Sequence, residues 1–370
     1  MRRIFLLILA GCMLICPAAQ GSEALTVAAK GAVLIDGVSG RILFAQNADK
    51  MLPEASCTKI MTALLAVENA SLTEEVTAGK NAYGVPGTSI YLSEGETLTM
   101  EQMLYGLMLR SGNDAAVAIA EHVAGSVTAF AELANARAAE LNADAHFVNP
   151  HGLDADGHRA SALGLARIMR EALKHDEFRT ITGTKRKIIP WVGNEYSRVL
   201  ENKNRLLSSY EGATGGKTGF TSKAGRCLVF SAERDGLELI GAVLNCYTWF
   251  DTATVMLDYG FDNFRMERAL EFGQEVTQVS VLGGEQASVR LVASEALSGA
   301  VEIGKTVQVE VDANALTAPV RAGQVAGTAR LVSDGKTIDS CDLVAANAVE
   351  AWSLVAAIRK VFRNWALQFG

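Results

Sequence analysis

The pattern of hydrophobic residues changes near residue 266, and this change restricts the chain to a fold with two different parts. Before it, apolar residues recur at helical spacing in several segments, with strand-like runs near both ends. After it, short valine-rich segments alternate with Gly, Asp and Asn turns, as in residues 276–281 and 328–333. We therefore predict a mixed α+β domain over residues 25–265 and a small all-β domain over residues 266–349.

Individual segments of the first part carry clear signals. Residues 32–36 and 41–44 predict two strands of a hairpin, because four turn-type residues separate them. A helix is expected to open near Ser56, and another at Thr99, where a T-x-x-Q capping-box pattern begins. Further helices are predicted over 114–124, 128–141, 161–173 and 252–259, and further strands over 228–231 and 237–244.

Residues 1–24 predict a segment that directs export. Two arginines precede an apolar run over residues 4–16, and small residues follow. This is the pattern of a secretory signal peptide, and the run is too short for an ordinary transmembrane helix. A lipoprotein box at residues 9–12 is the alternative, but the apolar run continues past Cys12, which favours ordinary cleavage. The mature protein is therefore expected outside the cytoplasmic membrane.

The end of the chain, residues 350–370, predicts an amphipathic helix. Three cationic residues, Arg359, Lys360 and Arg363, lie on one face of a helical wheel. An apolar face with aromatic residues beside a cationic face is typical of a helix that lies in a membrane interface. We expect peripheral attachment to the outer face of the cytoplasmic membrane, with packing on the β domain as the alternative. The residues of the apolar face are Leu354, Val355, Ile358, Val361, Phe362, Trp365 and Phe369.

Charge and cysteine content exclude several classes of function. The net charge is −7 and no basic stripe is present, so nucleic acid is not an expected partner. After the predicted signal peptide, Cys57, Cys227, Cys246 and Cys341 remain, at spacings that fit no metal or redox pattern. Buried free thiols are expected, with a Cys227–Cys246 disulfide as the alternative. The loop 151–158 fits no zinc pattern either, so no cofactor and no metal are expected.

The first of three chemical motifs is the S-x-x-K tetrad Ser56-Cys57-Thr58-Lys59. On a helix, Lys59 lies over the same face as Ser56. A serine needs a base to become a good nucleophile, and a lysine can serve if burial or neighbouring cations lower its pKa. About one such tetrad is expected by chance in a chain of this composition, so its meaning depends on its context.

Two further motifs supply that context. Ser111-Gly112-Asn113 lies between two predicted helices, and Lys217-Thr218-Gly219 follows a glycine pair and precedes a predicted strand. Alone, each is explained equally well by a loop or a tight turn. Together, and in this order on an exported chain, S-x-x-K, S-x-N and K-T-G form the signature of penicillin-binding proteins and serine β-lactamases.

The resemblance to one family is closer still. Longer phrases around the motifs are similar to the low-molecular-mass D-alanyl-D-alanine carboxypeptidases of the S11 peptidase family: 53–62, 111–116, 149–154 and 216–221. The resemblance implies a transpeptidase-type domain, in which helices and a helical lobe flank an antiparallel sheet. It also implies two ligands, the peptidoglycan stem peptide ending in D-Ala-D-Ala and β-lactam antibiotics. The β-rich domain and the tail match the family's layout without a sharp motif.

The resemblance also implies roles for the residues of the first two motifs. Ser56 would attack the carbonyl between the two D-alanines and form an acyl-enzyme, with Lys59 as the general base. Ser111 would relay a proton to the leaving amine, and Asn113 would hold a substrate amide. Water activated on the Lys59 and Ser111 side would then release the acyl group, whereas a β-lactam would remain on Ser56.

In the third motif, Lys217 would shape the electrostatics of the site and Thr218 would bind the terminal carboxylate. Beyond Gly219, the backbone amide of Phe220 would complete the oxyanion hole with that of the nucleophile. Trp249 stands near the place where some relatives carry an arginine for the carboxylate, which leaves that contact open.

Four alternatives are weighed against a carboxypeptidase. A DD-endopeptidase of crosslinks uses the same chemistry and differs in cleft shape. A class A β-lactamase needs a carboxylate for fast deacylation, and no counterpart is evident. A non-catalytic penicillin-binding protein is disfavoured because the three motifs are intact. A Ser-His-Asp hydrolase is disfavoured because no G-x-S-x-G elbow occurs.

Overall fold

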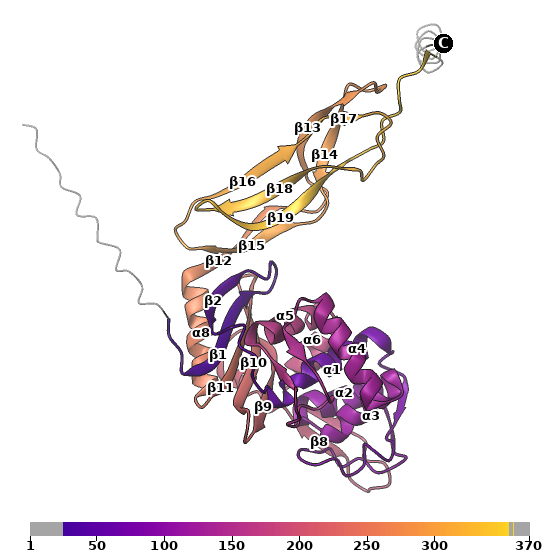
Figure 1. Ribbon diagram of the computed structural model, residues 1–370, viewed down its shortest axis with the longest axis vertical. Coiled ribbons are helices and arrows are strands. Elements are labelled where there is room, and N and C mark those ends of the chain that lie inside the picture. Colours follow the sequence, from indigo (N-terminus) through magenta and orange to yellow (C-terminus); the bar gives the residue numbers. More distant parts are fainter. Residues whose placement is uncertain (1–24, 355–357, 359–370) are drawn as a thin grey trace, which may run out of the picture.

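The computed structural model describes residues 25–354 and residue 358 (Figure 1). The predicted signal peptide and most of the predicted tail helix lie outside the described residues. The described chain has two parts, an α+β part that ends with helix α8 and an all-β part that begins with strand β12 (Figure 1). The predicted α+β fold class is therefore confirmed.

A five-stranded antiparallel sheet organises the first part. Its order is β2-β1-β11-β10-β9, so the N-terminal hairpin pairs with strands about two hundred residues later. The predicted hairpin is confirmed, with longer strands than its apolar runs indicated. The strands are β1 (Ala29–Asp36), β2 (Ile42–Gln46), β9 (Ala213–Thr221), β10 (Gly225–Arg234) and β11 (Leu237–Cys246).

Helices cover both faces of this sheet, which explains why β1 and β11 are apolar almost throughout. Val33 and Ile35 of β1 pack with helix α5 and the helical lobe. Ala32 and Leu34, on the opposite face, pack with α8. Successive strand residues therefore enter two different cores. The bounds are α5 (Ala162–Ala172) and α8 (Trp249–Asn263).

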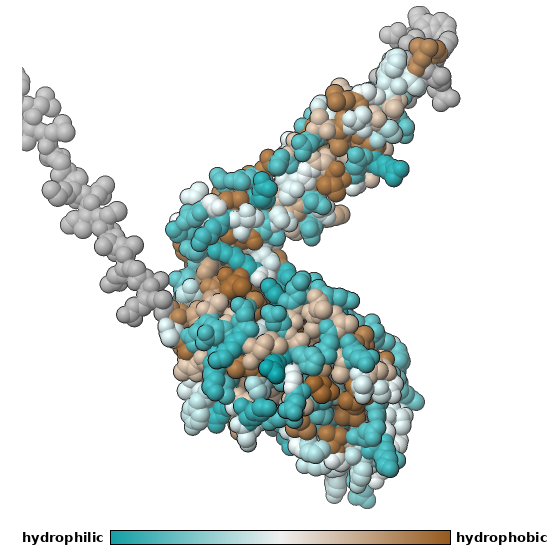
Figure 2. Space-filling view, in the orientation of Figure 1, coloured by the Kyte–Doolittle hydropathy of each residue, from teal (hydrophilic) through white to brown (hydrophobic). Residues whose placement is uncertain are grey.

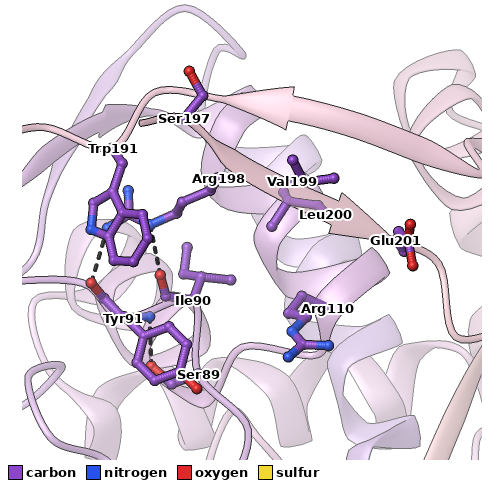
Figure 3. Close-up of a pocket in the computed structure, with 10 residues that line it drawn as sticks. All are labelled: Ser89, Ile90, Tyr91, Arg110, Trp191, Ser197, Arg198, Val199, Leu200 and Glu201. Carbon is purple, nitrogen blue, oxygen red and sulfur yellow. Dashed lines mark hydrogen bonds between the residues drawn. The ribbon is translucent and has the colours of Figure 1, made fainter. Parts of the chain in front are cut away.

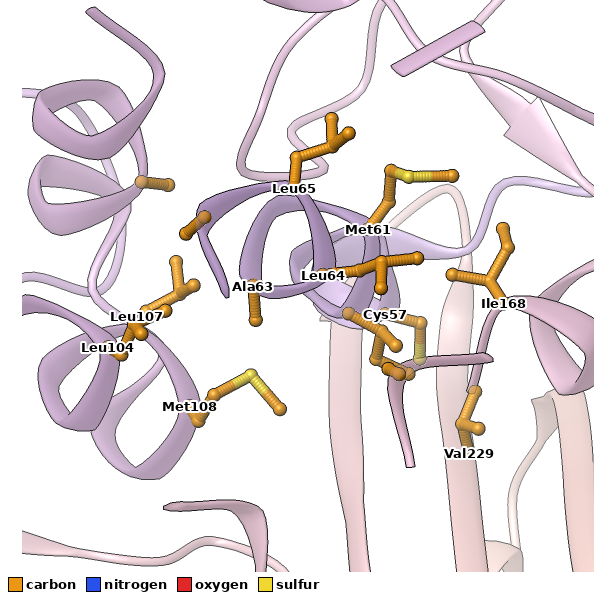
Figure 4. Close-up of a cluster of buried hydrophobic side chains, with 14 of the residues drawn as sticks. Cys57, Met61, Ala63, Leu64, Leu65, Leu104, Leu107, Met108, Ile168 and Val229 are labelled. Carbon is orange, nitrogen blue, oxygen red and sulfur yellow. The ribbon is translucent and has the colours of Figure 1, made fainter. Parts of the chain in front are cut away.

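The helical lobe is built around α1 (Lys59–Asn69), whose first eight residues are all buried. Figure 4 shows side chains of α1 directed both toward Leu104 and Leu107 and toward Ile168 and Val229, so the helix joins the lobe to the sheet. The predicted capping box at Thr99 is confirmed. The other helices are α2 (Met100–Tyr105), η2 (Gly106–Arg110), α3 (Asn113–Ala124), α4 (Val127–Glu140), α6 (Asp176–Gly183) and α7 (Leu206–Ser209).

Three short antiparallel strand pairs lie in the lobe, and the pair of β7 and β8 is the one that matters most for the candidate site. They are β3 (Glu75–Thr77) with β4 (Thr97–Thr99), β5 (Ala145–His146) with β6 (Arg159–Ala160), and β7 (Arg186–Ile189) with β8 (Arg198–Glu201). Within the described residues, no single helix has both the length and the apolar composition to cross a membrane. The bent pair of α3 and α4 meets those two criteria only jointly.

The all-β part has its own core, formed by Leu291, Leu331, Leu343 and their neighbours. The predicted boundary after residue 265 falls inside β12, whose Phe264 packs in the first part and whose Leu270 packs in the second. A six-stranded sheet runs in the order β16-β18-β19-β14-β13-β17, beside the pair β12-β15. The strands are β12 (Phe264–Leu270), β13 (Glu275–Leu282), β14 (Ser288–Ala293), β15 (Leu297–Glu302), β16 (Val307–Ala313), β17 (Leu316–Thr317), β18 (Val325–Ser333) and β19 (Lys336–Ala345).

The turn after β1 links the two parts. Asp36 is fully buried, and its Oδ2 accepts a 2.9 Å hydrogen bond from the amide of Ala300 in β15. Arg41 donates a 2.7 Å hydrogen bond to the carbonyl of the same alanine. A buried carboxylate is stable only when it is hydrogen-bonded, so this contact fixes where the β-rich part meets the sheet.

Candidate active site

Ser56 lies in a single turn of 3₁₀ helix, η1 (Ala55–Thr58), directly before α1. Ala55 has φ of +51°, a left-handed conformation that costs energy for a residue with a side chain. Lys59 is the first residue of α1, and its Nζ lies 3.0 Å from Ser56 Oγ. The spacing of the S-x-x-K tetrad thus brings the two side chains together as predicted.

Lys59 is fully buried, and two further acceptors hold its amine. Its Nζ donates to Asn113 Oδ1 at 2.7 Å and to the carbonyl of His151 at 2.6 Å. Burial, aided by the nearby cations Lys217 and Lys203, holds the pKa of Lys59 well below its usual range. A lowered pKa favours the neutral amine, and a neutral amine whose two N–H groups are engaged keeps its lone pair for the Ser56 hydroxyl.

The S-x-N motif forms the tight link between η2 and α3. Ser111 adopts a left-handed conformation with φ of +68°, which ends η2 and turns the chain. Asn113 then opens α3, and its Nδ2 donates a 2.6 Å hydrogen bond to the carbonyl of Pro86. Because Oδ1 accepts from Lys59 and one N–H donates to Pro86, a single N–H of the Asn113 amide remains available.

Lys217 belongs to β9 and is almost completely buried. Its Nζ donates hydrogen bonds to Ser111 Oγ at 3.0 Å and to the carbonyl of Thr218 at 2.8 Å. Burial lowers the pKa of Lys217 to about 7, and the charge on Lys203 acts in the same direction. The second and third motifs therefore meet in one hydrogen bond, between two residues that lie on either side of the cleft.

The K-T-G motif lies within a strand rather than in a turn before one. β9 is an edge strand, and β10 is its one strand partner among the described residues. On its outer edge the Thr182 hydroxyl hydrogen-bonds the backbone of Gly216, so the stretch open to an extended peptide begins after Gly216. A Cβ on Gly219 would lie 2.7 Å from the carbonyl oxygen of Glu54 and 3.0 Å from the amide nitrogen of Ser56. Only glycine allows this approach, which brings the backbone before Phe220 close to the amide of Ser56.

A buried cluster beneath η1 was missed by the sequence analysis. Thr58 Oγ1 lies 2.9 Å from both Glu54 Oε1 and His158 Nε2, and His158 Nε2 lies 2.9 Å from Glu54 Oε1. His158 Nδ1 accepts from the amide of Val148, so the ring proton is on Nε2. This cluster anchors the loop whose His151 carbonyl accepts a hydrogen bond from Lys59. The residues are a hundred positions apart, so spacing gave no signal.

Lys203 is a second residue that no motif indicated. Its side chain is exposed at the surface, yet partial desolvation together with the charge of Arg110 lowers its pKa. Its own charge acts on both Lys59 and Lys217. Lys203 and Arg110 therefore place positive charge beside the cleft.

Trp249 opens α8 and packs against Phe250, with ring centroids 4.9 Å apart. The guanidinium of Arg226 lies 5.9 Å from the centre of the Trp249 ring, and Arg226 pairs with Phe220 across β9 and β10. Trp249 is thus part of an aromatic surface on the α8 side of the sheet edge, beside Arg226.

The described cysteines are all buried and free, which confirms the expected thiols and shows that a Cys227–Cys246 disulfide is wrong. Burial raises the pKa of Cys57 well above its usual range and that of Cys227 to about 12, so both thiols stay protonated and unreactive. Across residues 25–354, no cluster of three or more His, Cys, Asp or Glu side chains could hold a metal ion.

A buried lysine 3.0 Å from a serine hydroxyl, with a second lysine bonded to a second serine in the same cleft, is typical of enzymes that form an acyl-serine without a catalytic histidine. Comparison with known proteins identifies the family. The model of the D-alanyl-D-alanine carboxypeptidase family, peptidase S11, matches residues 18–248. The model of the penicillin-binding protein 5 C-terminal domain matches residues 264–351. The chain belongs to the S11 D-alanyl-D-alanine carboxypeptidases.

Individual relatives support this assignment over most of the chain. The D-alanyl-D-alanine carboxypeptidase DacF of Bacillus subtilis is 32% identical over 351 residues, which is 91% of this chain and 90% of the relative. DacC of Escherichia coli is 34% identical over 354 residues, covering 90% and 87%. The crystal structure of penicillin-binding protein 5 from Haemophilus influenzae superimposes with a TM-score of 0.79 at 31% identity, covering 89% of this chain and 100% of that one. The predicted family, the predicted activity and the predicted transpeptidase-type domain followed by a small all-β domain are confirmed.

Proposed function

We propose that Ser56 is the nucleophile of this carboxypeptidase and that Lys59 is its general base. The observation that carries the proposal is the position of Lys59 Nζ, which is buried and 3.0 Å from Ser56 Oγ. As the Ser56 oxygen attacks the carbonyl between the two D-alanines, its proton passes to the neutral amine. The two other acceptors of that amine hold it in place, so no reorganisation is required during the transfer.

Ser111 is proposed to deliver a proton to the leaving D-alanine. When the tetrahedral intermediate collapses, the C–N bond breaks and the departing nitrogen needs a proton. Ser111 Oγ lies beside Lys217 Nζ, and a lysine with a pKa of about 7 can replace a proton that the hydroxyl gives up. Water then attacks the ester on Ser56 and releases the shortened peptide as a carboxylate.

The free edge of β9 is proposed to bind the substrate. Thr218 would hold the terminal carboxylate, and the amides of Ser56 and Phe220 would stabilise the developing oxyanion. The close approach of Gly219 to η1 supports this arrangement, because it brings both backbone segments to one side of the scissile carbonyl. The remaining N–H of Asn113 would bind an amide on the acyl side.

A β-lactamase is disfavoured by the surroundings of the nearest carboxylate in sequence. Glu54 hydrogen-bonds to Thr58 and His158 below η1, where it supports the loop instead of activating a water for deacylation. A penicillin bound to Ser56 would therefore be released slowly. As a family of cell-wall enzymes implies, the ligands are peptidoglycan stem peptides and β-lactams, and the protein acts outside the cytoplasmic membrane.

For the tail, we propose that residues 350–370 form a helix that attaches the protein to the membrane surface. Near the end of the described chain, the backbone amide of Trp352 donates a 2.7 Å hydrogen bond to the carbonyl of Gly283, beside the exposed Leu282. Trp352 and Leu354 are themselves more than half exposed. This end of the β domain is remote from the α+β part (Figure 1) and carries apolar residues among polar ones (Figure 2). The β domain, residues 266–349, would then hold the catalytic domain, residues 25–265, away from the lipid.

Two assays test these proposals. Purified protein is incubated with fluorescent penicillin and with a peptide ending in D-Ala-D-Ala. The wild type should be labelled and should release D-alanine, whereas Ser56→Ala should do neither while keeping the wild-type melting temperature. Labelling of Ser56→Ala would overturn the nucleophile, and rapid penicillin turnover would favour a β-lactamase. Lipid vesicles should retain the full chain and lose a variant that ends at residue 351.

A further inference from the structure

A cavity of about 370 Å³ adjoins the cleft between the loop of residues 89–91 and the β7–β8 hairpin (Figure 3). Its volume falls in the range of small-molecule sites and exceeds what an alanine methyl group requires. None of the three motifs lines it, so the reaction described above leaves it unexplained. Its lining residues are Ser89, Ile90, Tyr91, Arg110, Trp191, Ser197, Arg198, Val199, Leu200 and Glu201.

The cavity lies on the leaving-group side of the cleft. Arg110 directly precedes Ser111, and Glu201 is two residues before Lys203. In the proposed binding mode the scissile carbonyl faces the amide of Phe220 and the terminal carboxylate faces Thr218, so the substrate runs antiparallel to β9. Any continuation of the leaving residue therefore passes toward Ser111 and the cavity behind it.

One wall of the cavity is aromatic and rigid. The rings of Tyr91 and Trp191 are stacked, with centroids 6.4 Å apart. Arg198 lies 5.0 Å from the Trp191 ring centre, and its buried guanidinium donates to both oxygens of Glu96 at 2.6 and 2.8 Å. It also donates to the carbonyls of Ile90 and Tyr91. These bonds fix the wall in place, so apolar parts of a ligand could pack on it without first ordering it.

A free cation faces this wall. Arg110 is exposed, and its side chain makes no hydrogen bond or ion pair within the described part of the chain; Figure 3 shows it across the cavity from Tyr91 and Trp191. Arg198, by contrast, is fully engaged by Glu96. A guanidinium without a partner is suited to a two-pronged contact with a carboxylate. Glu201, at the end of β8, adds a negative charge that opposes an anion, so Arg110 is the only lining group available to anchor one.

We propose that this cavity is a leaving-group subsite for an amino acid larger than D-alanine, with an extended side chain that ends in a carboxylate. The inference rests on the proposed function of Ser56 and the edge of β9. The chemistry is unchanged: the Ser56 oxygen forms an ester, the C–N bond to the larger residue breaks, and its nitrogen leaves as an amine with the proton from the Ser111 side. The subsite thus widens the range of leaving groups, from D-alanine to larger amino acids.

The test uses three peptides with the same diacetyl-L-lysyl-D-alanyl half, which end in D-alanine, in D-2-aminoadipate or in its side-chain amide. Release of the last residue is measured as kcat/KM. Arg110→Ala should lose about tenfold more on the D-2-aminoadipate peptide than on the other two, because only that side chain carries the charge that the guanidinium binds. Glu201→Gln should instead raise the ratio of kcat/KM on the D-2-aminoadipate peptide to that on the other two peptides, because an opposing negative charge is removed. Arg321→Ala, an exposed arginine of the β domain, should leave the ratio unchanged.

Equal effects of Arg110→Ala on all three peptides, or no effect on any, would overturn the subsite. Labelling by fluorescent penicillin is measured on every variant, because it reports the nucleophile alone. Normal labelling with an unchanged ratio would contradict the subsite only, whereas absence of both labelling and D-alanine release in the wild type would contradict the proposed function.

Discussion

The two parts of this molecule place their charges differently. The α+β part buries Lys59, Lys217 and Glu54 close to Ser56, and a further ion pair of Arg198 and Glu96 nearby. In the described residues of the all-β part, the buried polar side chains are serines, and ion pairs such as Lys305–Asp334 are exposed. Burying a charge costs stability unless it is well paired. Among the described residues, the cost of burying charged groups therefore falls on the α+β part, which contains the candidate site.

The comparison predicts that removing a buried cation damages activity more than stability. Lys59→Ala should lower the rate of acylation by penicillin about 10³-fold or more, because the general base is lost. The melting temperature should stay the same or rise, since an unfavourably buried amine is removed. Stopped-flow acylation and calorimetry measure the two effects. A variant that unfolds while its folded fraction reacts normally would assign Lys59 a structural role instead.

Close packing around the nucleophile should be the next most sensitive feature. Gly219→Ala places a Cβ within 2.7 Å of a backbone oxygen of Glu54, so β9 must move away from η1. A displacement of about 1 Å can cost about 10²-fold in rate. The acylation rate should fall accordingly. Gly335→Ala, at an open turn of the β domain, is the control for glycine replacement and should leave the rate unchanged.

In the β domain the order of effects should reverse. Leu343 is fully buried in the core of that domain, and Leu343→Ala should reduce its free energy of unfolding by about 2–5 kcal/mol. The kcat/KM of the folded enzyme should stay within about twofold, because the site is distant. Urea denaturation and D-alanine release provide the measurements. A large loss of kcat/KM in the folded protein would show that the two parts are coupled.

The smallest effect is expected at an exposed ion pair of the β domain. Arg290 and Glu275 are 3.3 Å apart with side chains about half exposed. Solvent screens such a pair, so Arg290→Ala should change the free energy of unfolding by less than about 0.5 kcal/mol. A loss of several kcal/mol on denaturation would mean that charge matters for stability in this domain as well.

The same contrast explains what the sequence could predict. Local patterns were sufficient for the β1–β2 hairpin, the capping box at Thr99 and the S-x-x-K contact, because each depends on residues close in the chain. β9 was missed, since its sequence ATGGKTGFT contains three glycines and no clear alternation of apolar residues. Its strand conformation comes from pairing with β10 and from the approach to η1.

Two parts of the site depend on tertiary contacts that spacing does not encode. His158 meets Glu54 only because the loop after β5 folds under η1. Lys203 reaches the cleft from the chain after β8, and no motif surrounds it. The motif residues could therefore be predicted, whereas the groups that set their pKa values and hold their loops could not.

The pH dependence of penicillin acylation tests the central claim most directly, that a buried, neutral lysine activates Ser56. A base must be deprotonated, so the rate should fall as pH decreases through the lowered pKa of Lys59. Because Lys59 and Lys217 are coupled, the apparent pKa belongs to the pair. We predict a plateau by about pH 8 and a fall below pH 7, consistent with the pKa of about 7 for Lys217. A rate that keeps rising to about pH 10, as for an ordinary lysine, would contradict the account.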